Sequence, residues 1–414
     1  MLIINYNLMK QAIILFLLLI SLSISAQDII QWRGIDRTGI YTEKGLLKSW
    51  PKSGPQLLWH FDNLGEGHSS VAIANDKIYI TGLKDGKGQL FVLDMNGKLL
   101  NKIPYGPEWD TSYNGSRGTV SISDGKLYIY SGLGTLTCFD EKSLKILWQK
   151  NIVDDFKGSN IRWGVNESPL IIGEKIIITP GGKVNNVVAL DKNTGNIIWA
   201  CPGEGDLPAY CSPLYISELE VPLIATMTGK HILGIDAKTG EKLWSYPYEN
   251  NRGIHPVTPI YDGKDMILFT GGYNKGAYMF RLKNGGRSIE KVWEQPKLQT
   301  QHGGMVKIGN YVYAGGDFRS NRYWYCVDWN TGEVKWKTDE ISVGAVIADG
   351  NNLMYCYTEK GKMVLVNPNP QKFEIISKFN ITLGTEQHWA HPVIHKGVLY
   401  VRHGDTLMAY DIKK

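Results

Sequence analysis

Histidine and tyrosine side chains recur at one position of a repeating pattern, directly before short apolar segments spaced like strands. Both residue types exchange protons when their surroundings tune their pKa values. Five of the nine histidines lie at this position, namely His68, His255, His302, His388 and His391. Because titratable groups gathered in one place are typical of functional sites, the sequence predicts a site there. We expect His302 and His388 to transfer protons, with Tyr210 and His255 as further catalytic candidates.

Arginine and tryptophan residues accompany these histidines. The planar guanidinium group donates a fork of hydrogen bonds that suits a carboxylate or a sulfate. We predict that Arg162 and Arg252 bind a carboxylate and that Trp163 and Trp389 stack on sugar rings. The full predicted substrate-binding set is Arg117, Arg162, Trp163, Glu167, Arg252 and Trp389. Together these residues favour an acidic oligosaccharide as the partner.

The predicted chemistry is β-elimination on a uronate sugar. An arginine against the carboxylate neutralises the charge that grows when the C5 proton leaves. One histidine or tyrosine takes that proton while another protonates the group leaving C4, and the product is an unsaturated uronic acid. The enzyme is a lyase if a sugar leaves and a dehydratase if water leaves, and the sequence leaves both open.

Metal binding is a further alternative for the same histidines. His68 and His391 are candidate ligands of a divalent metal, which would have to lie about 2 Å from each ligand nitrogen. His388 and His391 are three residues apart, and this spacing allows shared ligation without requiring it. The sequence therefore leaves open whether a metal is bound.

Repeated strand pairs are the elements that must position these residues. Residues 188–199 read Val-Ala-Leu-Asp-Lys-Asn-Thr-Gly-Asn-Ile-Ile-Trp, which is typical of a hairpin with a tight glycine turn. Close copies occupy residues 235–244 and 327–336. Units spaced by 39 to 51 residues are anchored on Asp94, Asp140, Asp191, Asp236, Arg281, Asp328, Asn367 and Asp411. A second strand pair precedes each hairpin, so the sequence predicts an all-β, eight-bladed β-propeller of four-stranded antiparallel blades.

The two ends of the repeat predict how the ring closes. The last unit ends at Lys414 without the closing apolar run and tryptophan, whereas a spare run with Trp59 precedes the first unit. We therefore expect the N-terminal strand to close the last blade and to protect its sheet edge. In such a ring the inner strands surround one channel, and the candidate site residues precede the inner strands of seven units. The entrance of the seventh unit, residues 341–343, carries none of them.

The N-terminus has the pattern of a secretory signal. Lys10, an apolar run over residues 12–19 and small residues before Ala26 predict a signal peptide over residues 1–26. Residues 27–54 are predicted to lie across one propeller face, and residues 55–414 form the propeller. The protein is therefore expected to be exported, periplasmic or secreted, with no transmembrane segment after signal removal.

The Ala-x-Asp-x-x-Thr-Gly-x-x-x-Trp pattern of residues 189–199 resembles the pyrroloquinoline quinone (PQQ)-like repeat family over residues 55–414. This resemblance implies the propeller fold, which hosts many activities. The chain is also similar, in residue types, to secreted propeller lyases and to PQQ-like proteins that degrade uronate polysaccharides such as ulvan. Those lyases use histidine, tyrosine and arginine for elimination.

The resemblance also implies two alternatives. PQQ-dependent alcohol dehydrogenases carry a vicinal cysteine pair and a Glu, Asn and Asp set for calcium, whereas this chain has no adjacent cysteines and offers only Asn166 and Glu167. PQQ is therefore not supported by the site residues. The second alternative is a non-catalytic scaffold similar to the propeller lipoprotein of outer-membrane protein assembly, although no lipid-anchor cysteine follows Ala26.

The composition excludes some partners. The chain is 43% hydrophobic and 21% charged, with a formal net charge of +5 and no run rich in lysine or arginine. Nucleic acid is therefore not expected as a partner. Cys201 and Cys211 are a candidate disulfide pair whose connectivity the sequence leaves open, as it does the oligomeric state.

Overall fold

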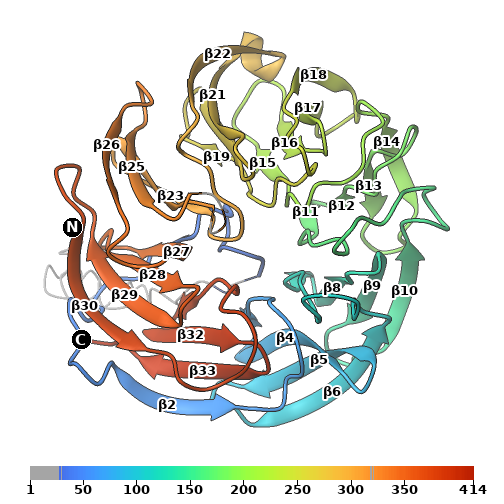
Figure 1. Cartoon of the computed structure of the whole chain (residues 1–414). Coiled ribbons are helices and arrows are strands. Elements are labelled where there is room, and N and C mark those ends of the chain that lie inside the picture. The colour runs from blue at the N-terminus through green and yellow to red at the C-terminus, as the bar shows by residue number, and fades with distance from the viewer. Residues whose placement is uncertain (1–27, 29, 318, 320) are drawn as a thin grey trace, which may run out of the picture.

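Eight sheets form a ring around a central axis (Figure 1). The structure is a computed structural model that describes residues 28, 30–317, 319 and 321–414. The predicted signal peptide, residues 1–26, lies outside the described residues. Each sheet has four antiparallel strands, and one sheet carries an additional short strand. The predicted eight-bladed β-propeller is confirmed.

In blades 1 to 7 the strands follow chain order from the innermost strand outward, and in blade 8 the early strand β2 is outermost. Blades 1 to 4 consist of β3 (Ala72–Ala74), β4 (Lys77–Lys84), β5 (Lys87–Asp94), β6 (Leu99–Gly106); β7 (Ser121–Ser123), β8 (Lys126–Tyr130), β9 (Thr135–Asp140), β10 (Ile146–Asn151); β11 (Leu170–Ile172), β12 (Lys175–Ile178), β13 (Val187–Asp191), β14 (Ile197–Cys201); and β15 (Leu214–Ile216), β16 (Leu223–Met227), β17 (His231–Asp236), β18 (Lys242–Pro247). Blades 5 to 8 consist of β19 (Ile260–Tyr261), β20 (Met266–Gly271), β21 (Gly276–Lys283), β22 (Ser288–Gln295); β23 (Met305–Ile308), β24 (Tyr311–Gly315), β25 (Trp324–Asp328), β26 (Val334–Thr338); β27 (Gly344–Asp349), β28 (Met354–Thr358), β29 (Lys362–Asn367), β30 (Glu374–Asn380); and β31 (Val393–His395), β32 (Val398–His403), β33 (Thr406–Asp411), β2 (Gln56–Phe61). One 3-10 turn, η1 (Asn284–Gly286), lies between β21 and β22.

The Asp-x-x-Thr-Gly pattern builds the turn of the outer hairpins in blades 3, 4 and 6. The Asp191 carboxylate accepts hydrogen bonds from the backbone N–H groups of Asn193 and Thr194, at 2.9 and 2.8 Å, and from the Thr194 hydroxyl at 3.0 Å. Gly195 then adopts a left-handed conformation, with φ of 71°, that glycine takes without a Cβ penalty. The turn therefore needs both the aspartate and the glycine.

The tryptophan that ends the pattern joins one blade to the next. The Trp148 ring packs on the turn glycine of the following blade, Gly195, and its Nε1 donates to the Lys192 carbonyl at 3.2 Å. Trp293 repeats this contact on Gly332 and donates to the Trp329 carbonyl at 3.0 Å. The repeat motif therefore encodes contacts between blades as well as hairpins within them.

The ring closes as predicted. Strand β2 pairs with β33 in an antiparallel register from Gln56 opposite Asp411 to Phe61 opposite Leu407. Trp59 on β2 packs on Gly97 of blade 1 and donates to the Met95 carbonyl at 3.0 Å. The two ends of the chain thus share one blade, and that blade uses the same contact between neighbours.

The N-terminal segment reaches further inward than the propeller face to which the sequence assigned residues 27–54. Strand β1 (Ile40–Tyr41) pairs in parallel with β27, the innermost strand of blade 7. The backbone N–H of Ile122 in β7 donates to the Ile30 carbonyl at 2.8 Å. Residues 30–41 therefore lie against the inner strands, near the axis of the ring.

Two further observations concern the cysteines and the helices of the described residues. Cys201 and Cys211 are buried and free, as are the other three cysteines, so the candidate pair forms no disulfide in the structure. Within residues 28, 30–317, 319 and 321–414, no helix has the length and apolar character needed to cross a membrane.

The contact between blades predicts the effect of a single methyl group. A Cβ on Gly240 would lie 2.6 Å from the Trp199 ring, at a φ of 79°. We expect Gly240→Ala to lower the free energy of unfolding by about 3 kcal/mol, from left-handed strain and overpacking together. Gly263→Ala is the matched control, because Gly263 has a φ of 80° and nothing within 4 Å of its would-be Cβ. Its expected cost is about 1 kcal/mol in the same denaturation experiment, and equal costs would contradict the role of the tryptophan contact.

A buried carboxyl makes stability depend on pH. Glu167 is 4% exposed and accepts a hydrogen bond from the Thr179 backbone N–H at 2.7 Å. Burial raises the pKa of Glu167 from 4.5 to about 8. Its contribution to stability is therefore fully present below the unfolded-state pKa and is lost as the pH rises toward about 8.

Glu167→Gln keeps the acceptor oxygen and removes this titration. We expect the variant to gain on the order of 3 kcal/mol relative to the wild type between about pH 5 and pH 8, measured by chemical denaturation at both pH values. Glu218→Gln is the control, because Glu218 is exposed. A difference between wild type and Glu167→Gln that did not change with pH would contradict the burial effect.

Candidate functional site

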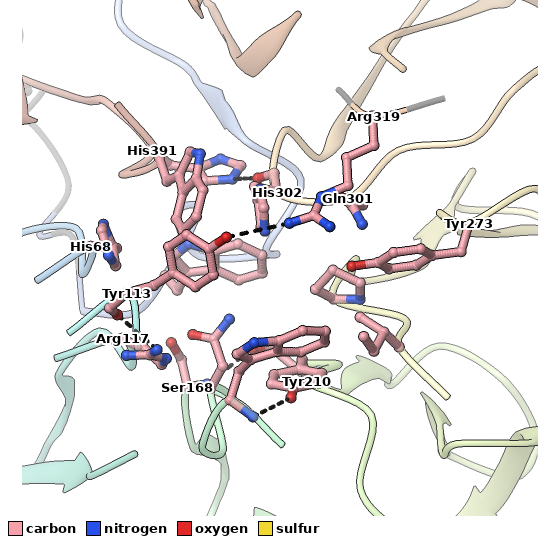
Figure 2. A pocket seen from close by; sticks show the side chains of 17 residues that line it. His68, Tyr113, Arg117, Ser168, Tyr210, Tyr273, Gln301, His302, Arg319 and His391 are labelled. Atoms are coloured by element: carbon pink, nitrogen blue, oxygen red, sulfur yellow. Dashed lines mark hydrogen bonds between the residues drawn. The ribbon is translucent and has the colours of Figure 1, made fainter. Parts of the chain in front are cut away.

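A pocket opens at the centre of the ring, with a volume of about 1020 Å³ that includes its open mouth (Figure 2). Most of its lining comes from the loops that lead into the inner strands, as the sequence predicted. The lining residues are Trp32, His68, Tyr113, Arg117, Trp163, Asn166, Ser168, Tyr210, Ser212, Ile254, Pro256, Tyr273, Gln301, His302, Arg319, Trp389 and His391. The entrance of the seventh blade, residues 341–343, contributes none of them.

The structure brings together about half of the predicted site residues. Of the predicted catalytic residues, Tyr210 and His302 line the pocket. The predicted binding residues and candidate metal ligands that line it are Arg117, Trp163, Trp389, His68 and His391. His255, His388, Arg162, Glu167 and Arg252 are not among the lining residues.

Three tyrosines enter the pocket from strained backbone. Tyr113, Tyr210 and Tyr273 have φ angles of 48°, 70° and 57°, in the left-handed region that bulky residues rarely adopt. The Tyr210 hydroxyl accepts a hydrogen bond from the Trp163 backbone N–H at 3.1 Å. Burial raises the pKa of Tyr210 to about 12. Strain at three tyrosines of one pocket is typical of a functional site, since the surrounding structure must hold each of them in place.

His302 lies in an aromatic stack. Its ring lies parallel to the Trp389 indole, with 4.4 Å between centroids, and His68 contacts the same indole at 5.1 Å. The Nδ1 of His302 is 3.9 Å from Oε1 of Glu359, too far for a hydrogen bond but close enough to attract a protonated ring. Burial, together with the charge of Arg117, holds the pKa of His68 well below its usual value, so His68 is neutral near pH 7.

His391 is fixed by hydrogen bonds on both ring nitrogens. Nη1 of Arg33 donates to its Nδ1 at 2.9 Å, and its Nε2–H donates to the His302 carbonyl at 2.6 Å. Burial lowers the pKa of His391 to about 3. His391 thus holds the backbone of His302, and neither nitrogen is available to a metal. Within the described parts of the chain, no three His, Cys, Asp or Glu residues form a group that could hold a metal ion.

Of the four arginines at or near the pocket, Arg117 is half-buried and the other three are exposed. Arg117 donates to the carbonyls of Gly115 and Tyr113, at 2.7 and 2.9 Å, and so holds the loop that presents Tyr113. Arg319 extends from the loop between β24 and β25 and donates to the Tyr113 hydroxyl at 3.3 Å. Arg162 and Arg252 are exposed, and Arg162 lies 5.0 Å over the Trp163 ring.

Two predicted catalytic histidines turn into the protein. His255 is 0% exposed and packs against Tyr248, and burial lowers its pKa to about 3. His388 stacks on His403 at 3.6 Å and shares a 2.7 Å hydrogen bond with the Tyr357 hydroxyl. Burial lowers the pKa of His388 to about 4. The next residue in the same loop, Trp389, lines the pocket, whereas His388 does not.

Among the described residues that line the pocket there are cations but no aspartate or glutamate. Glu167, the predicted acidic member of the site, is buried beside the Thr179 backbone rather than in the lining. An aromatic concavity with arginine and histidine and without carboxylates favours an organic anion as its ligand.

Ten of the seventeen lining residues were not among the predicted site residues, and three of these ten lie outside the predicted entrance loops. Trp32 comes from the N-terminal segment, whereas Tyr273 and Arg319 come from hairpin loops rather than from the loops before inner strands. The repeat position gave no signal for them, because they reach the pocket from other parts of the blade. Trp32 belongs to a segment rich in glycine and charge, Gln31–Ile40, which was the available hint.

The described pocket lining lacks the groups that hold the quinone cofactor in PQQ-dependent dehydrogenases. Calcium prefers oxygen ligands, with carboxylates prominent among them, and the lining has no carboxylate. No cysteine lines the pocket either, and all five are free. The residues present therefore do not fit a calcium-bound quinone held by a vicinal disulfide.

Comparisons with known proteins place the chain among PQQ-like propellers. The tetrathionate hydrolase of Acidithiobacillus ferrooxidans is 23% identical over 296 residues, which are 67% of this chain and 53% of that protein. The outer membrane protein assembly factor BamB of Shewanella oneidensis is 22% identical over 214 residues, 51% of each protein. The chain thus spans about half the length of these curated relatives.

Solved structures show the same fold. The quinohemoprotein alcohol dehydrogenase of Comamonas testosteroni superposes with a TM-score of 0.68 at 12% identity, over 93% of this chain and 80% of that one. The sequence relatives, which also include a quinoprotein ethanol dehydrogenase of Pseudomonas aeruginosa that is 26% identical over 34% of this chain and 25% of that protein, agree better with the two alternatives, a scaffold or a dehydrogenase-like propeller, than with uronate elimination. Residues 106–338, more than half of the chain, match the family described as outer membrane protein assembly factor BamB. The chain therefore belongs to this family of PQQ-like propellers.

Proposed function

We propose that the chain is an exported enzyme that binds an acidic, uronate-containing oligosaccharide in the central pocket and catalyses β-elimination. The observation that carries this proposal is the composition of the lining, in which arginine, tryptophan and proton-transfer residues surround one cavity without a carboxylate. The described lining therefore has no negative side chain that would repel a bound anion. The relative named tetrathionate hydrolase also acts on an anion, which agrees with this choice of ligand.

Each part of a uronate sugar has a matching group in the pocket. Arg319 and Arg117 supply the positive charge for the carboxylate, and the exposed Arg162 and Arg252 extend it at the rim. Trp163 and Trp389 offer faces for stacking on sugar rings. In this assignment the carboxylate lies on the arginine side, so charge that develops at C5 is neutralised as it forms.

His302 and Tyr210 carry the two proton transfers. His302 takes the C5 proton, and Glu359 at 3.9 Å attracts the imidazolium that results. The electron pair of the C5–H bond forms the C4–C5 double bond, and the C4–O bond breaks with its pair on the leaving oxygen. Because its pKa is about 12, Tyr210 is protonated at neutral pH and gives that oxygen a proton. The reaction balances without an oxidant or reductant.

The family match favours a second candidate, a non-catalytic scaffold. Residues 106–338 belong to the family named for outer membrane protein assembly, and one relative carries that name. A scaffold would act through its outer surfaces, so the residues of the central pocket would be dispensable. Export, which the N-terminal signal predicts, is part of both candidates.

Pocket substitutions test the proposed chemistry. Purified protein is incubated with ulvan oligosaccharides and other uronate oligosaccharides, and the ultraviolet absorbance of the new double bond is followed. We expect Tyr210→Phe and His302→Ala each to lower kcat by about 100-fold or more, because each removes one proton transfer. His60→Ala is the control, since His60 lies on the outer strand β2, with a side chain 42% exposed.

Mass analysis of the products separates the two types of elimination. Loss of water identifies a dehydratase, and chain cleavage identifies a lyase. Full activity in both pocket variants would refute the site, and absence of unsaturated product across the whole panel would favour the scaffold.

A further inference from the structure

Two hollows lie on opposite sides of one short segment near the axis of the ring. The central pocket is lined by Trp32, whereas a second hollow is lined by Gln31 and by residues 35–38. The second hollow is also lined by residues of the strands β11, β15 and β19. The central pocket is lined by residues of the loops that precede those strands. Residues 31–38, which we call the septum, therefore separate the two ends of the channel.

Two buried arginines anchor the septum to the inner strands. Nη1 of Arg33 donates to the Val346 carbonyl at 3.1 Å, and its Nη2 donates to the Met305 carbonyl. Arg37 donates to the carbonyls of Pro213 and Pro169 at 3.1 and 2.8 Å, on the other side of the ring. Both arginines are 3% exposed. The septum thus spans the channel between blades 3 and 4 and blades 6 and 7.

The local backbone keeps the septum compact. Arg33 and Arg37 have φ angles of 62° and 55°, and Gly34 and Gly39 have φ angles of 80° and 74°. The N–H of Arg37 donates to the Gly34 carbonyl at 3.1 Å, and that of Gly39 to the Arg33 carbonyl at 2.9 Å. Four left-handed residues within seven therefore coil the chain tightly where it crosses near the axis.

The septum also supports the wall of the pocket. The Trp32 ring contacts His391 edge to face, with 5.2 Å between centroids and an angle of 72°. Arg33 donates to the same His391, which in turn donates to the carbonyl of His302. The segment that blocks the channel is therefore joined by hydrogen bonds to the predicted proton-transfer residue.

We infer that the septum makes the central pocket blind, so that the pocket takes the end of an anionic sugar chain and not an internal stretch of a polymer. This inference rests on the proposed function. A chain that threaded the ring would need an open channel, and residues 31–38 occupy it. The terminal uronate would then lie against Trp32, and the rest of the oligosaccharide would leave through the mouth. Trp32 is accordingly a specificity-determining residue that sets the depth of the pocket.

Product analysis of the full-length protein tests the blind pocket. Ulvan polymer and short ulvan oligosaccharides are compared at equal mass, and double bonds and chain lengths are both measured. We expect turnover to scale with the number of chain ends, with one double bond per end and no early fall in polymer length. Early shortening of the polymer by internal cleavage would overturn the inference while leaving elimination intact. If neither substrate gives a double bond, the proposed function fails and the inference falls with it.

Substitution of the septum tests the role of Trp32. We expect Trp32→Ala to raise KM for short oligosaccharides about tenfold or more through the loss of an aromatic contact. Trp32→Phe, which keeps a ring, should restore most of the affinity and guards against a folding defect. Ile35→Ala is the matched control, because Ile35 lies in the same segment but lines the opposite hollow, 45% exposed. Equal KM values in wild type, Trp32→Ala and Ile35→Ala would overturn the assignment of Trp32.

Discussion

The packing of a tryptophan on the turn glycine of the next blade is the contact on which the ring depends. It occurs between Trp148 and Gly195 and again where the chain ends meet, between Trp59 and Gly97. Each contact covers one face of an indole at a place where only a glycine leaves room, so the spacing between neighbouring blades has little freedom. A ring of blades held in this way brings their entrance loops to one point, and the central pocket forms there.

The ring also explains how strained residues persist in the pocket. A left-handed tyrosine costs free energy, and three of them lie in loops whose two ends are fixed by strands of a closed ring. Hydrogen bonds add local support, as in the loop that Arg117 holds through the carbonyls of Gly115 and Tyr113. Because the scaffold bears this cost, the tyrosine side chains are presented to the cavity in a defined orientation.

The repeat made the fold and the location of the pocket predictable, but not the direction of each side chain. Tyr210 and His302 were found because their position in the repeat places them at an entrance loop. His388 shares that position, yet it stacks on His403, and Trp389 beside it faces the cavity. Spacing reports where a loop begins, whereas tertiary packing decides which of its residues turns inward. Trp32 was missed for a different reason, since it lies outside the repeat and reaches the axis through Arg33 and Arg37.

Family membership and pocket chemistry constrain different parts of this molecule. The match over residues 106–338 includes copies of the hairpin motif, and the motif lies on the outer side of the blades, away from the pocket. The septum constrains the region near the axis, where hydrogen bonds from two buried guanidinium groups anchor it to the inner strands. Burial lowers the pKa of Arg33 and Arg37 only to about 10, so both remain charged at neutral pH. Arg33 contacts His391 in the lining of the central pocket, so its charge would favour an anionic ligand there. The buried arginines thus hold the N-terminal segment across the axis, and under the proposed function their charge also favours an anion in the pocket.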